Sequence, residues 1–146
     1  MAVSIKSPRE IELMRHSCQL LAEVFEVMSK VIAPGISTWD IDRLGEETIL
    51  GMGCTPNFKN YNGYPASICV SVNDQLIHGI PSKKKILEEG DIVSLDCGLI
   101  YKNYHSDAAR TYPVGKITPE LEKLIEVTRQ SFFEGIKHAY AVNHLN

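Results

Sequence analysis

Apolar residues near the N-terminus recur every three or four positions, which is the spacing of a helix with one buried face. Ser7 can cap this helix, Pro8 suits its first position, and Glu10 completes a capping box. The apolar positions of the predicted face are Ile11, Met14, Cys18, Leu21, Val24, Phe25, Met28 and Val31. Pro34 and Gly35 then end the helix.

Two more helices follow from the same kind of pattern. Ser37 or Thr38 caps the second, which ends between residues 51 and 53. Thr118 and Pro119 open the third, which runs to about residue 139. We expect the first two helices to form a hairpin that covers a sheet.

The middle of the chain carries strand signals. Residues 54–65 are rich in turn formers and predict a loop, whereas residues 66–73 alternate and predict a strand. Residues 76–81 predict a short extended piece. Residues 91–100 and 104–114 predict two further strands. The order of helices, strands and helix indicates an α+β fold with an antiparallel sheet covered by helices.

Two carboxylates interrupt the last two strands. Lys102 and Asn103 can form a two-residue turn, because asparagine tolerates positive φ. Such a hairpin pairs Asp96 with position 109, or with position 107 if the turn falls slightly earlier. Asp107 shares a face with Asp96 in either register, within about 5–8 Å at Cβ. The pair fits a solvent-exposed hairpin face, where aspartate is harmless, or a cation site that needs further ligands.

Composition narrows the classes of function. The length of 146 residues suits one domain over residues 1–146. The net charge of −3 gives no sign of nucleic-acid binding. No apolar run reaches the roughly 18 residues of a membrane span, and the N-terminus lacks a signal core. We therefore expect a cytoplasmic protein. The run Lys83, Lys84 and Lys85 indicates a solvated loop.

Cysteines and histidines add little by spacing alone. The four cysteines, Cys18, Cys54, Cys69 and Cys97, form no CxxC pair, so we expect them reduced and buried rather than bound to zinc. His16 is expected at the surface. His105 lies on the same face of its predicted strand as Asp107. His78 comes just before the sequence Gly-Ile-Pro, a rigid segment where the chain leaves a strand. The residues by themselves indicate only a carboxylate site with an imidazole nearby.

Three segments, taken together, resemble the bacterial type I methionine aminopeptidases. They are IKSPREIELMR at residues 5–15, NGYPASICVSVNDQLIHGIP at 62–81, and GDIVSLDCGLIYKNYHSDAARTYPVG at 90–115. The resemblance covers almost the whole chain in order. It implies half of a pita-bread fold and an enzyme that removes the initiator methionine from nascent polypeptides.

The same resemblance implies roles for six residues. Asp96 and Asp107 match two ligands of a pair of divalent metal ions, which can be cobalt, manganese, iron or zinc. His78 matches a catalytic histidine that contacts the substrate near the scissile amide. Substrate binding is further implied for the methionine pocket, at Tyr64, Cys69 and Phe58.

The chain departs from the family in extent. The remaining ligands, one histidine and two glutamates, lie in the second half of the family sequence, so we expect a truncated chain with at most a weak partial metal site and no activity alone. Asn60 and Asn103 stand where the family often has glycine. The alternatives are a non-catalytic pita-bread binding module, an inactive fragment, or a proline-specific peptidase, although Tyr64 and Cys69 favour methionine. We also expect a homodimer, or else aggregation, through the sheet edge and apolar surface that the second half of the family fold would cover.

Overall fold

Within residues 4–144, three α-helices form where the sequence predicts their caps. The computed structural model describes residues 4–144. Helices α1 (Pro8–Ser29) and α2 (Thr38–Gly51) both begin with a reciprocal capping box, built by Ser7 with Glu10 and by Ser37 with Asp40. Ser37, not Thr38, is therefore the cap of α2. Helix α3 (Pro119–Ile136) is capped by Thr118, and ends before residue 139.

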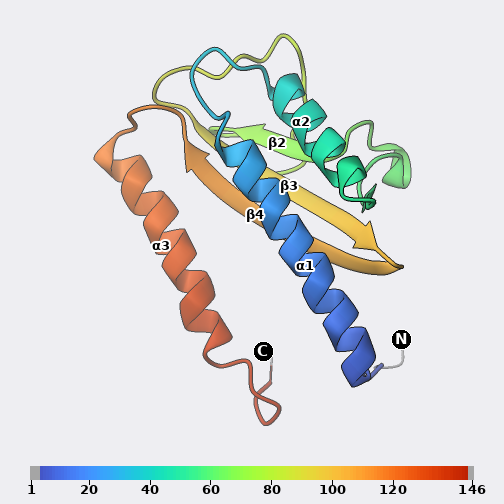
Figure 1. Ribbon diagram of the computed structural model, residues 1–146. Helices are drawn as coiled ribbons and strands as arrows, with labels where there is room; N and C mark the ends of the chain where they lie inside the picture. The colour runs from blue at the N-terminus through green and yellow to red at the C-terminus, as the bar shows by residue number, and fades with distance from the viewer. Residues whose placement is uncertain (1–3, 145–146) are drawn as a thin grey trace.

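The strands form one antiparallel sheet around a central strand (Figure 1). Strand β3 (Ile92–Tyr101) pairs along its whole length with β4 (Tyr104–Pro113). The other edge of β3 pairs first with β2 (Ile68–Val72) and then with the two-residue β1 (Thr55–Pro56). The α+β class and the antiparallel sheet covered by helices are confirmed.

The core lies between this sheet and the pair α1 and α2, which cover one face of it (Figure 1). The odd positions of β3 face this core and are completely buried, as their alternation predicts: Val93, Leu95, Cys97 and Leu99. Gly45 lets α2 approach the sheet closely, because a Cβ there would lie 2.8 Å from the side chain of Ile68. The opposite face of β3, which carries Asp96, is not covered by α1 or α2.

The predicted apolar face of α1 is wrong in its first half. Ile11, Met14 and Cys18 are exposed, so Cys18 is not the buried cysteine we expected, whereas the other three cysteines are buried. For Ile11 and Met14 the reason is geometric: the N-terminal turns of α1 extend past the end of the β3–β4 hairpin (Figure 1). At the level of Cys18 the helix still contacts β4, but the residue that faces the strand is Ser17, whose Oγ lies 3.0 Å from Oγ of Ser106.

Two smaller predictions need correction. The segment 54–65 contains β1 and a 3₁₀ turn at Tyr61–Gly63 rather than loop alone. Residues 76–81, predicted as a short extended piece, are interrupted at His78, whose φ is +57°. Gly79 O in this segment still accepts a hydrogen bond from Val70 N at 2.9 Å. The lysine run 83–85, by contrast, includes exposed positions on a loop, as expected. Across residues 4–144, the helices are all too short or too polar to cross a membrane.

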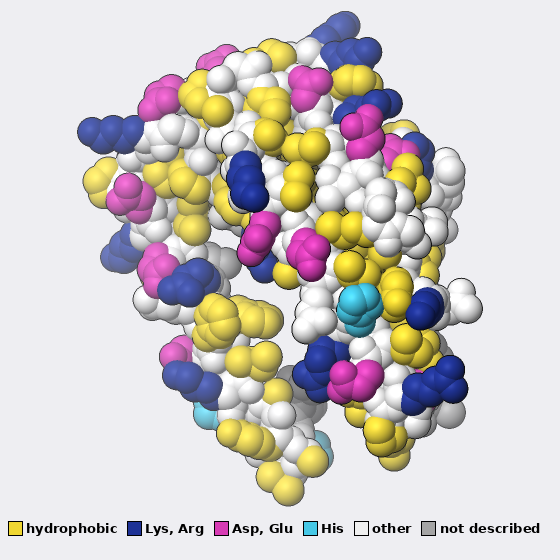
Figure 2. Space-filling model, viewed as in Figure 1, with side chains coloured by type: hydrophobic (Ala, Val, Ile, Leu, Met, Phe, Trp, Pro, Cys, Tyr) yellow, Lys and Arg dark blue, Asp and Glu magenta, His cyan; other side chains and the backbone are white. Residues whose placement is uncertain are grey.

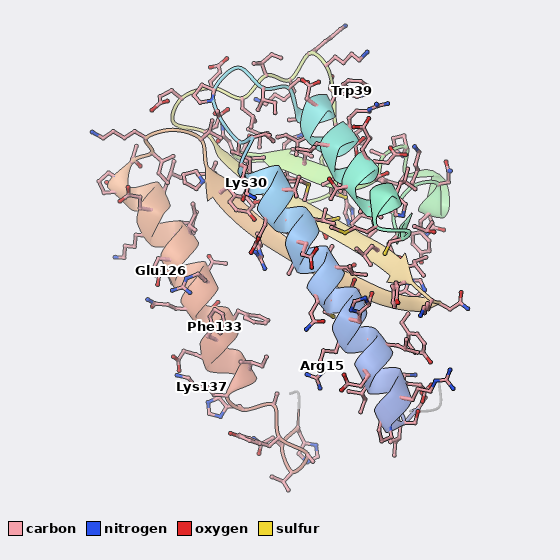
Figure 3. The ribbon with its side chains drawn as sticks, viewed as in Figure 1. Arg15, Lys30, Trp39, Glu126, Phe133 and Lys137 are labelled. Carbon is pink, nitrogen blue, oxygen red and sulfur yellow. The ribbon has the colours of Figure 1, made fainter. Side chains whose placement is uncertain are left out.

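Helix α3 is only loosely attached. It lies beside β4, and none of its residues is buried. Figure 2 shows an open gap between its C-terminal half and α1, and Phe133 projects from α3 toward that gap (Figure 3). Its exposed apolar side chains are Leu124, Val127, Phe132, Phe133 and Ile136. These side chains together form a large exposed apolar surface, and no other described element covers it.

Candidate functional site

One cavity of about 950 Å³ lies over the sheet face opposite α1 and α2, and all six residues singled out from the sequence line it. The structure therefore brings together Asp96, Asp107, His78, Tyr64, Cys69 and Phe58. Its remaining lining comes from eight residues: Asn57, Tyr61, Asn62, Gly63, Pro65, Ile80, Ile100 and His105. Segments far apart in the chain thus converge on one concave surface.

The β3–β4 hairpin sets the two carboxylates side by side. Lys102 and Asn103 both have positive φ, 47° and 69°, which is the conformation that a two-residue turn needs. Asp96 faces Ala109, which is the first of the two registers considered, and Asp107 faces Gly98. The aspartates are therefore diagonal neighbours on one face of the hairpin, with both side chains on the cavity.

Their electrostatics suit a cation. Burial raises the pKa of Asp96, the charge of Asp107 raises it further, and His78 opposes this only in part. Two converging carboxylates supply hard oxygen ligands, which divalent ions prefer. However, no cluster of three or more His, Cys, Asp or Glu side chains within residues 4–144 is arranged to hold a metal. The donors fit a metal but make an incomplete site.

His78 sits in an unusual backbone conformation. Its φ is +57°, a left-handed value that is uncommon outside glycine, although asparagine, aspartate and histidine adopt it more often than other residues do. Gly79 follows it, and a Cβ on this glycine would lie 2.2 Å from the carbonyl oxygen of Val70. The loop that carries His78 is thus pressed directly onto β2.

The other part of the cavity is formed by aromatic and sulfur-containing groups. Cys69 lies in β2 opposite Asp96 and is buried, and burial raises the pKa of its thiol. Burial also raises the pKa of Tyr64. With Phe58, these groups offer a soft surface of the kind that suits a thioether. Asn60, which replaces a frequent family glycine, has φ +67° and so takes the left-handed conformation that glycine would.

Sequence reasoning missed Asn57 as a member of the site. Its Oδ1 lies 2.7 Å from Nδ1 of His105, and its side chain lies against Gly98, where a Cβ would come within 2.9 Å of Asn57 Nδ2. His105 and Asp107 lie two residues apart in the predicted strand and therefore on the same face, and this spacing could have identified His105 as a member of the site. Asn57 gave none, because its place depends on the short pairing of β1 with β3.

The sequence matches the metallopeptidase family M24 over residues 12–143. This chain belongs to that family. A methionine aminopeptidase from Clostridium acetobutylicum is 48% identical over 143 residues, which are 98% of this chain and 57% of the relative. The M24 chain described here thus spans little more than half the length of the curated relatives that it matches.

Solved structures agree on the fold. The methionine aminopeptidase from Thermotoga maritima superposes with a TM-score of 0.90 at 40% identity, and the match covers 93% of this chain and 55% of that one. An Xaa-Pro dipeptidase from Bacillus anthracis reaches 0.77 at 29% identity, over 90% of this chain and 35% of that one. The resemblance to bacterial methionine aminopeptidases and their pita-bread fold is confirmed.

Proposed function

We propose that this chain forms the first half of a methionine aminopeptidase site, which takes the N-terminal methionine of a nascent polypeptide in the cytoplasm. The supporting observation is the cavity, which joins a carboxylate pair to a soft aromatic pocket. In this proposal Phe58, Tyr64 and Cys69 hold the methionine side chain. His78 then contacts the peptide near the scissile amide.

A pair of divalent metal ions completes the proposal, and Asp96 with Asp107 would supply two of the ligands. Manganese, cobalt, iron and zinc all accept carboxylate oxygen. When bound, such ions polarise the peptide carbonyl and make water a stronger nucleophile. The chain's own contribution is to hold two like charges together, a repulsion that a bound cation relieves.

Metal binding should be weak and should depend on the aspartate pair. Two carboxylates are too few donors for tight binding, so calorimetry with manganese or cobalt should give a dissociation constant of about 10⁻⁴ M or weaker. The Asp96→Asn, Asp107→Asn double variant should lose this binding. Asp74→Asn changes a carboxylate outside the cavity and serves as the matched control.

Tight binding that survives the double variant would place the metal elsewhere and would contradict the proposed site. Loss of binding in Asp74→Asn would contradict it equally. Both variants should be compared by thermal unfolding first, so that a loss of metal is not confused with a loss of fold.

Two other functions remain as alternatives. A proline-specific peptidase shares the fold, but the higher TM-score with a methionine aminopeptidase and the soft pocket favour methionine. A non-catalytic binding module would need the cavity but not the carboxylates. Peptide titration followed by NMR separates the two peptidases: shifts in the signals of Cys69 and Tyr64 with Met-Ala-Ser, but not with Ala-Pro-Ser, support methionine. A binding module would give the same shifts in the Asp96→Asn, Asp107→Asn double variant and with no added metal.

The exposed side of α3 leads us to propose self-association. Its apolar side chains are more than half exposed at Leu124 (55%), Val127 (53%) and Phe132 (63%), and the sheet leaves strand edges that can pair. Light scattering at micromolar concentration should therefore show a homodimer or larger aggregates. A Phe132→Ser, Phe133→Ser variant should shift the population toward monomer.

A stable monomer in the unmodified chain would show that the half-fold covers its own edge. The matched control is Thr128→Ala, Ser131→Ala, which changes two exposed polar residues of the same helix. It should leave the association state unchanged, because it removes two hydroxyls and only one methyl group, whereas the phenylalanine variant removes two aromatic rings.

A further inference from the structure

The loop that carries His78 is held against β2 through the peptide groups of the next residue. The carbonyl oxygen of Gly79 accepts a hydrogen bond from Val70 N at 2.9 Å. The amide of Gly79 donates to Ser71 Oγ at 3.1 Å. Both polar groups of this residue therefore have partners on the strand, as buried backbone groups require.

Tyr64 adds a third connection to the same residue. Its hydroxyl lies 3.0 Å from the carbonyl oxygen of Gly79 and 3.2 Å from that of Ile68, and can share its single proton between them. Tyr64 also lines the cavity. One side chain thus forms part of the pocket wall and fastens the loop to the first residue of β2.

A fastening is needed because His78 and Gly79 are conformationally demanding. His78 has φ +57°. This conformation costs a histidine free energy and persists only where the surrounding structure holds it. Gly79 approaches Val70 too closely for any side chain. Without the connections to Tyr64 and Ser71, His78 would have access to ordinary negative φ values, and its imidazole would leave its place on the cavity.

We propose that Tyr64 and Ser71 are positioning residues for His78: they clamp Gly79 to β2 and so hold the imidazole over the carboxylate pair. The clamp gives the Tyr64 hydroxyl a role that is separate from contact with the methionine side chain. It also assigns a role to Ser71, which is not among the residues that line the cavity. This inference rests on the proposed role of His78 for its functional meaning, but its geometry stands alone.

The first test removes only the hydroxyl of Tyr64. In Tyr64→Phe, amide exchange at Val70 and Gly79 should become about tenfold faster, since one buried connection is lost. In protein labelled at histidine ¹³Cε1, the His78 signal should shift, because the imidazole leaves the neighbourhood of the carboxylate pair, while thermal unfolding changes little. Tyr61→Phe is the matched control, because the Tyr61 hydroxyl bonds to none of the described residues and its side chain is 69% exposed.

The second test uses Ser71. Ser71→Ala should speed exchange at Gly79, and Ser71→Thr should restore protection because it keeps the hydroxyl acceptor. The clamp is wrong if the His78 signal and both exchange rates stay unchanged in Tyr64→Phe and Ser71→Ala. This failure is distinct from failure of the proposed function, which would appear as lost metal or peptide binding in a protein whose His78 loop remains clamped.

Discussion

The isolated chain should release methionine from Met-Ala-Ser about 10³-fold more slowly than a complete bacterial methionine aminopeptidase, or more slowly still, because the loss of even one preorganised stabilising group costs about 10²–10³ in kcat. The described residues offer a carboxylate pair but no cluster of three metal donors. The measurement is kcat/KM for both proteins after loading with the same manganese or cobalt concentration.

A rate close to that of the complete enzyme would contradict this expectation. If that rate were lost in Asp96→Asn, it would depend on this carboxylate, and a second copy of the chain would have to supply the missing donors. The control is a concentration series on the sample used for light scattering: where monomer dominates, activity carried by a dimer rises with the square of chain concentration.

Replacing Asp42 by alanine should destabilise the fold by about 3 kcal/mol, since two buried donors lose their acceptor. Asp42 lies in α2 and is buried, and its Oδ1 accepts from Ser67 N at 2.9 Å and from Ile68 N at 2.8 Å. These bonds tie α2 to the start of β2. Urea unfolding followed by circular dichroism measures the change.

Asp42→Asn is the matched control, because it keeps the acceptor oxygen and should cost within about 1 kcal/mol.

Burial raises the pKa of Asp42 above its ordinary 3.8, although the two backbone donors lower it. The folded chain then binds a proton at a pH where the unfolded chain does not. The stability of the unmodified chain relative to the Asp42→Asn variant should therefore increase as the pH falls toward that ordinary value. Equal losses in the alanine and asparagine variants would contradict this account.

Periodicity and caps predicted most of the fold, because these signals are local. Ser7 and Ser37 begin their helices where expected, and the odd positions of β3 are buried. The errors arose where tertiary position overrides pattern. Ile11 is apolar and correctly spaced, but it lies beyond the end of the hairpin, and no described element buries it. Strand β1 has two residues, too few for alternation to register.

The carboxylate site was partly accessible from first principles. The parity of a two-residue hairpin places Asp107 on the face of Asp96 whichever register forms, and the structure has that arrangement. The roles of His78, Tyr64, Cys69 and Phe58 came only from family resemblance. Three of these residues lie in loops, and Cys69 lies in β2 without a signal of its own. Their clustering is now observed, whereas their roles stay predictions until the experiments above are done.

The two-residue turn at Lys102 and Asn103 also restricts how this region can vary. Because side chains alternate across a strand, a single residue inserted into or deleted from either strand segment between an aspartate and the turn would move that carboxylate to the helix-covered face. Changes of two residues would preserve the face but shift the diagonal. Sequence length across this hairpin should therefore tolerate far less variation than the residues themselves, and the fixed interval between the two aspartates becomes a filter for recognising intact sites in divergent or fragmentary sequences.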